Sequence, residues 1–237
     1  MKKNIFILLT IFTFFCASCA KAQTLGAGVS VDSQGNLIIN APLYVFDRYG
    51  ENPKLEKAPT SINYEVDVGI YNSQKDDSNS HEFIGEIKKG RLSITIRKPN
   101  ENLLIEAMKF WHISENFFTN GSNVKIGELS LSTVKRDYIW IRLYPNLNAA
   151  RILEEPITDE RKYFIDDGHC EFFYSLGEVN ITGKVYEPKL TNWHYEFNLH
   201  LKQGWNIVNE RFYYDVKEEI EALTSITLSK DAVWVLY

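Results

Sequence analysis

The chain has 237 residues, of which 44% are hydrophobic and 14% aromatic, so it can bury a packed core and is not a disordered polymer. It carries 26 lysines and arginines against 31 acidic residues, a net charge of −5 that becomes −7 once residues 1–18, with Lys2 and Lys3, are removed. This acidic balance, spread along the chain, argues against a general nucleic-acid binder.

Residues 1–18 are predicted to be a lipoprotein signal peptide. A short basic start, Met1–Asn4, precedes an apolar run from Ile5 to Phe15 that is too short to span a bilayer. No later segment has the length and apolarity of a transmembrane helix, so the N-terminus is the expected membrane attachment.

Two cleavage sites compete at the end of this segment. Ala20-Lys21-Ala22 fits the small-residue rule of ordinary signal peptidase, which would release a soluble periplasmic or secreted chain at Gln23. Cys16-Ala17-Ser18-Cys19 instead resembles a relaxed lipobox, although Cys16 stands where Leu is usual. Lipid on Cys19 would hold the protein at the outer membrane or the periplasmic face of the cell envelope.

Of the three cysteines, Cys16 is removed with the signal peptide and Cys19 is either removed or lipidated, so Cys170 has no partner and no intramolecular disulfide is expected. Without a partner, it is predicted to be a small buried hydrophobic side chain.

Alternation of apolar and polar residues predicts an all-β fold, an antiparallel β-sandwich or barrel-like modules with one short helix. Two stretches have helical spacing: Glu101 to Ser114, with Asn100 as its N-cap, and a shorter one from Lys217 to Leu223. The predicted strands cover residues 36–49, 62–72, 82–88, 91–98, 124–133, 138–144, 162–166, 171–175, 178–186, 193–201, 205–215, 224–229 and 232–237.

Hairpin turns are expected at Lys89-Gly90, Asp166-Asp167-Gly168, Leu176-Gly177 and Gln203-Gly204. Residues 19–35 are predicted to be a tether. A break at Pro145–Pro156 then divides an N-terminal β module, residues 36–145, from a C-terminal β module, residues 146–237; one continuous β domain is the alternative.

The sequence Asp166-Asp167-Gly168-His169-Cys170-Glu171 gathers two carboxylates, an imidazole and a thiol, which are ligand types for zinc. The spacing is poor for a tetrahedral site, and Asp-Asp-Gly between two apolar runs is typical of a turn. The turn is the favoured interpretation.

His194, Glu196 and His200 share one face of the predicted strand 193–201 and form a candidate metal or acid/base row. If Lys202-Gln203-Gly204 forms a three-residue turn, Glu196 faces Glu210 on the next strand. A two-residue turn would instead place Glu210 opposite Phe197. The plainer interpretation of the row is the solvated face of a half-buried sheet.

Tyr138, Trp140, Arg142 and Tyr144 share the outer face of another predicted strand. Such a row suits stacking against sugar rings or docking of a protein. Burial of both faces is the alternative. No hydrolase, zinc-protease or nucleotide-binding motif is present, so no cofactor is expected and nothing supports an enzymatic activity.

Several segments resemble the uncharacterised β-rich exported lipoproteins of spirochaetes and Bacteroidetes, namely "FFCASC", "FIGEIKKGRLSITI", "LEEPITDERKYFIDDG", "LKQGWNIV" and "DAVWVLY". The resemblance implies a tethered or exported β domain at the cell envelope and supplies no catalytic residues. The expected function is a binding or interaction module with a protein or glycan partner. The alternatives are a carbohydrate-binding protein on the aromatic row and a hydrolase on the histidine row.

Overall fold

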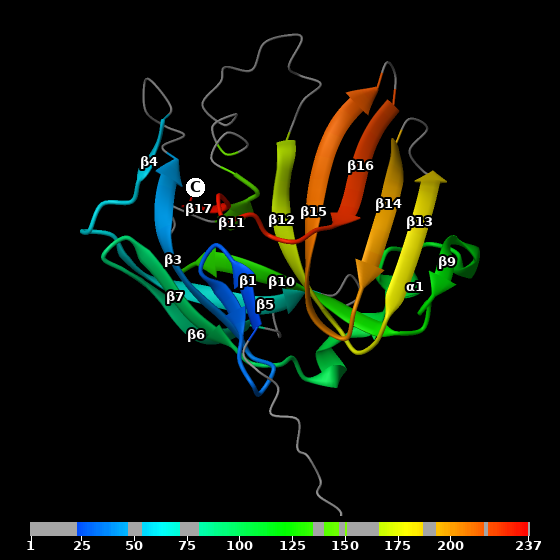
Figure 1. Ribbon diagram of the computed structural model, residues 1–237, viewed down its shortest axis with the longest axis horizontal. Helices are drawn as coiled ribbons and strands as arrows, with labels where there is room; N and C mark the ends of the chain where they lie inside the picture. The colour runs from blue at the N-terminus through cyan, green and yellow to red at the C-terminus, as the bar shows by residue number, and fades with distance from the viewer. Residues whose placement is uncertain are drawn as a thin grey trace, which may run out of the picture.

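The computed structural model describes residues 23–46, 54–71, 81–134, 140–146, 150, 166–186, 193–215 and 218–236. Strands dominate these residues and hydrogen-bond into one 17-stranded sheet, which confirms the all-β prediction (Figure 1). The predicted signal peptide and Cys19 lie outside the described residues, as does Tyr138.

Eight strands of this sheet close into a barrel, in which each strand pairs with the next and the last pairs with the first. Strands from both sides of residue 145 take part. In order around the barrel they are β3 (Leu37–Phe46), β7 (Arg91–Ile96), β6 (His81–Lys88), β5 (Asn63–Tyr71), β10 (Lys125–Thr133), β12 (Asp166–Ser175), β11 (Ile141–Tyr144) and β17 (Val233–Leu236).

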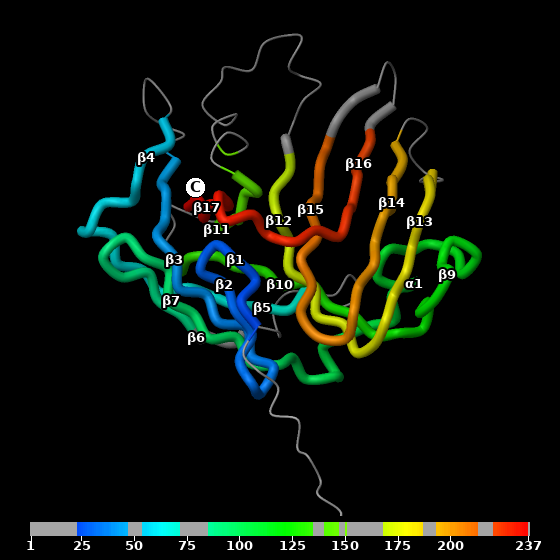
Figure 2. The backbone as a smooth tube through the Cα atoms, viewed as in Figure 1, coloured from blue at the N-terminus to red at the C-terminus, as the bar shows by residue number. Residues whose placement is uncertain are grey.

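On the edge of β12 that faces away from β10 and β11, a second row of strands extends the sheet beyond the barrel (Figure 1). The chain then returns from this row to β17 in the barrel wall (Figure 2). In spatial order the row consists of β15 (Gly204–Asp215), β16 (Glu218–Ser225), β14 (Trp193–Leu201), β13 (Val179–Tyr186) and β9 (Phe118–Asn120).

Shorter strands complete the described sheet. β4 (Leu55–Lys57) pairs with β3, and β8 (Ile105–Glu106) pairs with β10. β1 (Gln23–Gly26) and β2 (Val29–Val31) form a hairpin on β3, so residues inside the predicted tether 19–35 belong to the folded sheet. Trp234 anchors this hairpin, because its indole Nε1 donates a 3.1 Å hydrogen bond to the Ala27 carbonyl.

The single short helix that the sequence predicts is present, but it is much shorter than residues 101–114. This segment contains a 3-10 turn (Glu101–Leu103), β8 and the four-residue helix α1 (Ala107–Phe110), and a second 3-10 turn (Glu115–Phe117) follows it. Backbone N–H groups of Ala107 and Met108 donate to the carbonyls of Val124 and Ser122 instead of continuing a helix. Long-range pairing outweighs helical spacing at this point.

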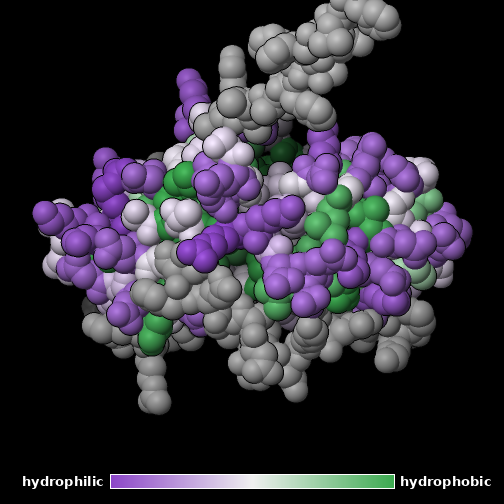
Figure 3. All heavy atoms as spheres, turned by 90° about the horizontal axis from the view of Figure 1, so that it is seen from below, coloured by the Kyte–Doolittle hydropathy of each residue, from purple (hydrophilic) through white to green (hydrophobic). Residues whose placement is uncertain are grey.

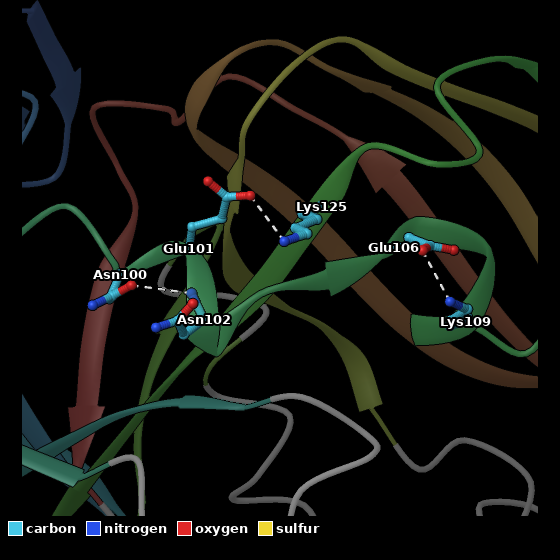
Figure 4. A network of polar contacts seen from close by, with 6 residues as sticks. All are labelled: Asn100, Glu101, Asn102, Glu106, Lys109 and Lys125. Atoms are coloured by element: carbon cyan, nitrogen blue, oxygen red, sulfur yellow. Dashed lines mark hydrogen bonds and ion pairs between the residues drawn. The ribbon is translucent and has the colours of Figure 1, made fainter.

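The start of this segment was predicted correctly at Asn100, whose side chain caps the first 3-10 turn by accepting a 3.1 Å hydrogen bond from the Asn102 N–H (Figure 4). Two ion pairs, Glu101 with Lys125 at 2.8 Å and Glu106 with Lys109 at 2.9 Å, lie beside it. Both pairs are solvent-exposed and therefore contribute little to stability.

The helix predicted over residues 217–223 is wrong, because its described residues, 218–223, belong to strand β16 (Glu218–Ser225). β16 runs between β15 and β14, and both of its edges are hydrogen-bonded. β14 and β15 are consequently not neighbours, and the predicted pairing of Glu196 with Glu210 does not occur. The pairs β14–β16 and β3–β17 are parallel, so the sheet is mixed and not purely antiparallel.

Of the four predicted hairpin turns, Lys89-Gly90 is confirmed: it joins the paired strands β6 and β7 with positive φ at both residues. Asp166-Asp167-Gly168 is not a turn, since it lies within β12, where the pairing with β15 is irregular and Gly168 has a φ of +99°. Leu176-Gly177 and Gln203-Gly204 do not close hairpins, because β12 pairs with β15 and not with β13, and β16 lies between β14 and β15.

Two large apolar clusters lie on opposite faces of the sheet. One fills the barrel and includes Cys170, Phe172 and Trp234. The other covers the outer face, where Phe173 packs with strands of the extension and with residues of α1. Hydrophilic side chains cover much of the described surface on the face seen from below (Figure 3).

Candidate functional site

The barrel wall has a three-cornered opening, because β10 and β11 both pair with the same edge of β12. Glu128 of β10 meets Phe173 at one corner, and Leu143 of β11 meets Cys170 at the second. Ser132 and Trp140 pair at the third corner. Between these points the three strands separate, and β15 occupies the opposite edge of β12.

A cavity of about 480 Å³ occupies this opening, which we call the fork cavity. Its volume lies in the range of small-molecule sites. The residues around it come from β5, β10, β11, β12, β15 and β17. Strand alternation gives it two kinds of wall: Leu129, Leu143 and Phe172 face the barrel core, whereas polar side chains alternate with them.

His169 is the centre of the polar wall and is only 2% exposed. Its Nε2 lies 2.6 Å from Glu171 Oε1 and 3.3 Å from Glu210 Oε2. The fold explains this convergence, because Glu171 follows two residues later on the same face of β12 and Glu210 is the cross-strand partner of His169 on β15. One ligand-type atom from each residue lies within 4.8 Å of the others.

Two further glutamates have strongly perturbed acidities. Burial, followed by the charges of Glu171 and Glu210, raises the pKa of Glu128 well above its ordinary value. Burial, followed by the charge of Glu210 and a hydrogen bond with it, raises the pKa of Glu221 to about 9. Both carboxyls are therefore held in the protonated form near neutral pH.

Glu210 behaves in the opposite way. Burial acts to raise its pKa, but the hydrogen bond and charge of His169, a hydrogen bond with Glu221 and the charge of Arg142 together lower it. Glu210 is thus the ionised partner of a carboxyl–carboxylate pair, with Glu221 as the protonated one.

The predicted aromatic row is divided by the fold. Trp140 is 45% exposed and lines the fork cavity, and the Arg142 guanidinium lies 5.9 Å from the centroid of its ring. Tyr144 is 1% exposed, with its ring centroid 6.5 Å from that of His169. Trp140 and Arg142 therefore line the cavity, while Tyr144 is buried and is not part of its lining.

The predicted histidine row does not converge on one point. His194 is buried and lies 3.5 Å from Glu196, whose carboxylate pairs at 2.6 Å with Lys184. The exposed His200 hydrogen-bonds Asn180 at 3.0 Å and is four residues from Glu196, roughly 13 Å along a strand. A single ion cannot contact all three residues of this row.

Cys170 is buried in the barrel core, which confirms the predicted role of its side chain. Burial, followed by the charge of Glu171, raises the pKa of the thiol to about 12. Cys170 therefore stays a neutral thiol near neutral pH and is a poor nucleophile.

Sequence reasoning found half of this site. The sequence contains His169 and Glu171 as a set of ligand types. However, it predicts a turn at Asp166–Gly168, and so it does not place both residues on one strand. The sequence placed Glu210 opposite Glu196 or, with the shorter turn, opposite Phe197, and not beside His169. Its contact with His169 depends on β12 and β15 being neighbours, for which the sequence carries no local signal.

Among the described residues, no helix is long and apolar enough to cross a membrane. The protein's function has to be inferred from the chemistry of the fork cavity itself, because comparisons with models of protein families, with curated proteins and with solved structures found no match.

Proposed function

We propose that this protein is an exported binding protein of the cell envelope and that its fork cavity binds a small carbohydrate. The observation that carries this proposal is the half-exposed indole of Trp140 at a cavity whose polar wall contains Arg142 and several carboxyl groups. An aromatic face stacks on a sugar ring, while carboxyl and guanidinium groups hydrogen-bond its hydroxyls.

The arrangement of the cavity supports a binding role. Apolar side chains form one wall and charged groups converge on the other, as in sites that orient a small ligand. Ser130 and Ser132 add hydroxyl groups along β10. Most of these groups project from paired strands, so little conformational entropy is lost on binding.

The experiment is calorimetry with the chain from Gln23 onward, in the presence of a chelator, against neutral hexoses, N-acetylhexosamines and their disaccharides. We expect saturable binding of at least one sugar, weakened at least about tenfold by Trp140→Ala. Tyr186→Ala is the matched control, since Tyr186 is also an exposed aromatic residue but lies on β13 outside the cavity. A panel without any binder, or equal losses in both variants, would contradict the proposal.

The cell-envelope location rests on the N-terminal sequence. A basic start, a short apolar run and a small-residue segment before Cys19 are the features of lipoprotein export. Mass spectrometry of the native N-terminus should find an acylated Cys19, and Cys19→Ala should move the protein from the membrane fraction to the soluble fraction. An unmodified chain that starts at Gln23 would contradict the lipid anchor and leave the sugar-binding proposal untouched.

A further inference from the structure

We propose that His169, Glu171 and Glu210 form a binding site for a divalent cation of the zinc class at the polar wall of the fork cavity. This inference goes beyond carbohydrate binding and does not depend on it. The site is distinct from the histidine row on β14, which the sequence offered as a candidate metal row.

The three ligand-type atoms come from positions that the fold fixes. His169 and Glu171 lie two residues apart on one face of β12, and Glu210 projects from the same face of the neighbouring strand. Their atoms lie within 4.8 Å of one another, with Nε2 at 2.6 Å and 3.3 Å from the two carboxylate oxygens. To bind zinc at bond lengths of about 2.0–2.2 Å, the Glu171 carboxylate would have to move away from Nε2, because ligand atoms on a tetrahedral zinc lie roughly 3.4 Å apart, whereas the Glu210 contact already has nearly that length.

The two carboxylates of this cluster share one imidazole nitrogen. A histidine Nε2 carries at most one hydrogen, and two carboxylate oxygens from different strands approach that single nitrogen. One N–H cannot make two full hydrogen bonds, so one of the two contacts is weak. A cation at the common centre would coordinate the nitrogen and both oxygens at once and would neutralise the two carboxylates.

The burial of the three side chains suits a cation with open coordination positions. The His169 side chain is 2% exposed, whereas those of Glu171 and Glu210 are 18% and 19% exposed. All three line the fork cavity, which Glu128 also lines. The ion would thus be held by three protein ligands and would keep a face toward the cavity for water or a ligand.

The donor set indicates the class of metal. Imidazole nitrogen combined with carboxylate oxygen suits zinc and its transition-metal neighbours, whereas Ca²⁺ and Mg²⁺ prefer all-oxygen sites. Cys170 also lines the fork cavity, but its side chain packs in the barrel core on the opposite face of β12 and is not part of the His169–Glu171–Glu210 group.

Calorimetry of the chelator-treated chain from Gln23 onward with ZnCl₂ tests the site. We expect one equivalent of Zn²⁺ to bind, with weak or absent binding of Mg²⁺ and Ca²⁺. Glu171→Gln and Glu210→Gln keep the size of the side chains and should each weaken Zn²⁺ binding at least about tenfold. His169→Ala should abolish it, and the glutamine variants decide the question if that variant does not fold.

The histidine row on β14 provides the matched controls. His200→Ala and Glu196→Gln alter an exposed histidine and a partly exposed glutamate on a different strand, and should leave Zn²⁺ binding unchanged. X-ray absorption of the zinc complex should show a first shell of nitrogen and oxygen with one imidazole. No stoichiometric binding, or binding that survives both glutamine variants but is lost in His200→Ala, would overturn the proposal.

Discussion

At His169 and the glutamates around it, burial and charge act against one another. Burial disfavours every ionised carboxylate. In the native structure some of these carboxyl groups are therefore protonated, and others are paired with a neighbouring group. Glu128 and Glu221 have raised pKa values, while Glu210 is ionised beside His169. Contact with the His169 imidazole therefore offsets the cost of burying the carboxylates of Glu171 and Glu210.

Glu221 should make the protein less stable as pH rises. Its pKa is about 4.5 in the unfolded chain and about 9 in the native state, so between these values folding takes up a proton. The stability is fully present below about pH 4.5 and is lost progressively as pH rises toward 9. Glu221→Gln keeps a hydrogen-bond donor toward Glu210 and should be more stable at pH 8, by on the order of 2 kcal/mol.

Urea unfolding at several pH values, with a chelator present, measures this effect. The native groups that interact with Glu221 are Glu210 on β15 and His169 on β12, and both remain in the variant. Glu128 also remains and contributes a residual slope of the same sign. Glu178→Gln alters an exposed glutamate on the surface and serves as the control. Parallel pH profiles for Glu221→Gln and the wild type would refute the assignment.

Cys170 should be chemically inert in the folded protein, because burial raises the pKa of its thiol to about 12 and blocks access. In a chain that begins at Gln23 it is the sole thiol. We expect no reaction with a disulfide reagent at pH 8 until the chain unfolds. A second thiol introduced by Lys230→Cys, at an exposed position, should react at once. Rapid labelling of native Cys170 would contradict its placement in the core.

At the scale of single elements, β12 and β16 differ most from their local signals. β12 continues through Asp166-Asp167-Gly168, where Gly168 takes a positive φ and a Cβ would lie 2.7 Å from the Arg211 side chain. β16 has the helical spacing of "KEEIEAL" yet pairs on both edges. In both elements, hydrogen bonds to distant strands outweigh a propensity of a few tenths of a kcal/mol per residue.

Hydrogen exchange should show β16 as one of the protected strands. The amides of Ile220 to Ser225 point alternately toward β14 and β15, so consecutive residues are hydrogen-bonded. We expect Ala222 and Leu223 to exchange about as slowly as Phe172 and Phe173 of β12, only through large unfolding events. Fast exchange together with helical chemical shifts for this segment would show that the helix prediction was right.

For the whole molecule, the decisive property is closure of the barrel by strands that are distant in the sequence. β12 and β17 come from the part of the chain after residue 145, and they complete a wall whose six other strands all precede it. The same closure produces the three-cornered opening, since β10 and β11 share one edge of β12.

Fragments of the chain test this interdependence. Residues 23–145 lack β12 and β17, so they expose the barrel core and both edges of an open sheet. We expect this fragment to show no cooperative thermal transition by circular dichroism, whereas residues 23–237 unfold in one transition. A sharp transition in the fragment, with dispersed amide resonances, would instead support two independent β modules.

The sequence by itself determined the strand-rich fold, most strand positions, the Lys89-Gly90 hairpin and the burial of Cys170, because these depend on local alternation, turn chemistry and hydrophobicity. It also contained the His169–Glu171 pair, two residues apart on one strand face. Only the tertiary structure decided that β16 is a strand, that β15 lies beside β12, and that Glu210 therefore meets His169. Alternation assigns side chains to a face, but which strands are neighbours is decided by the packing of the whole sheet, and the fork cavity exists only at that level.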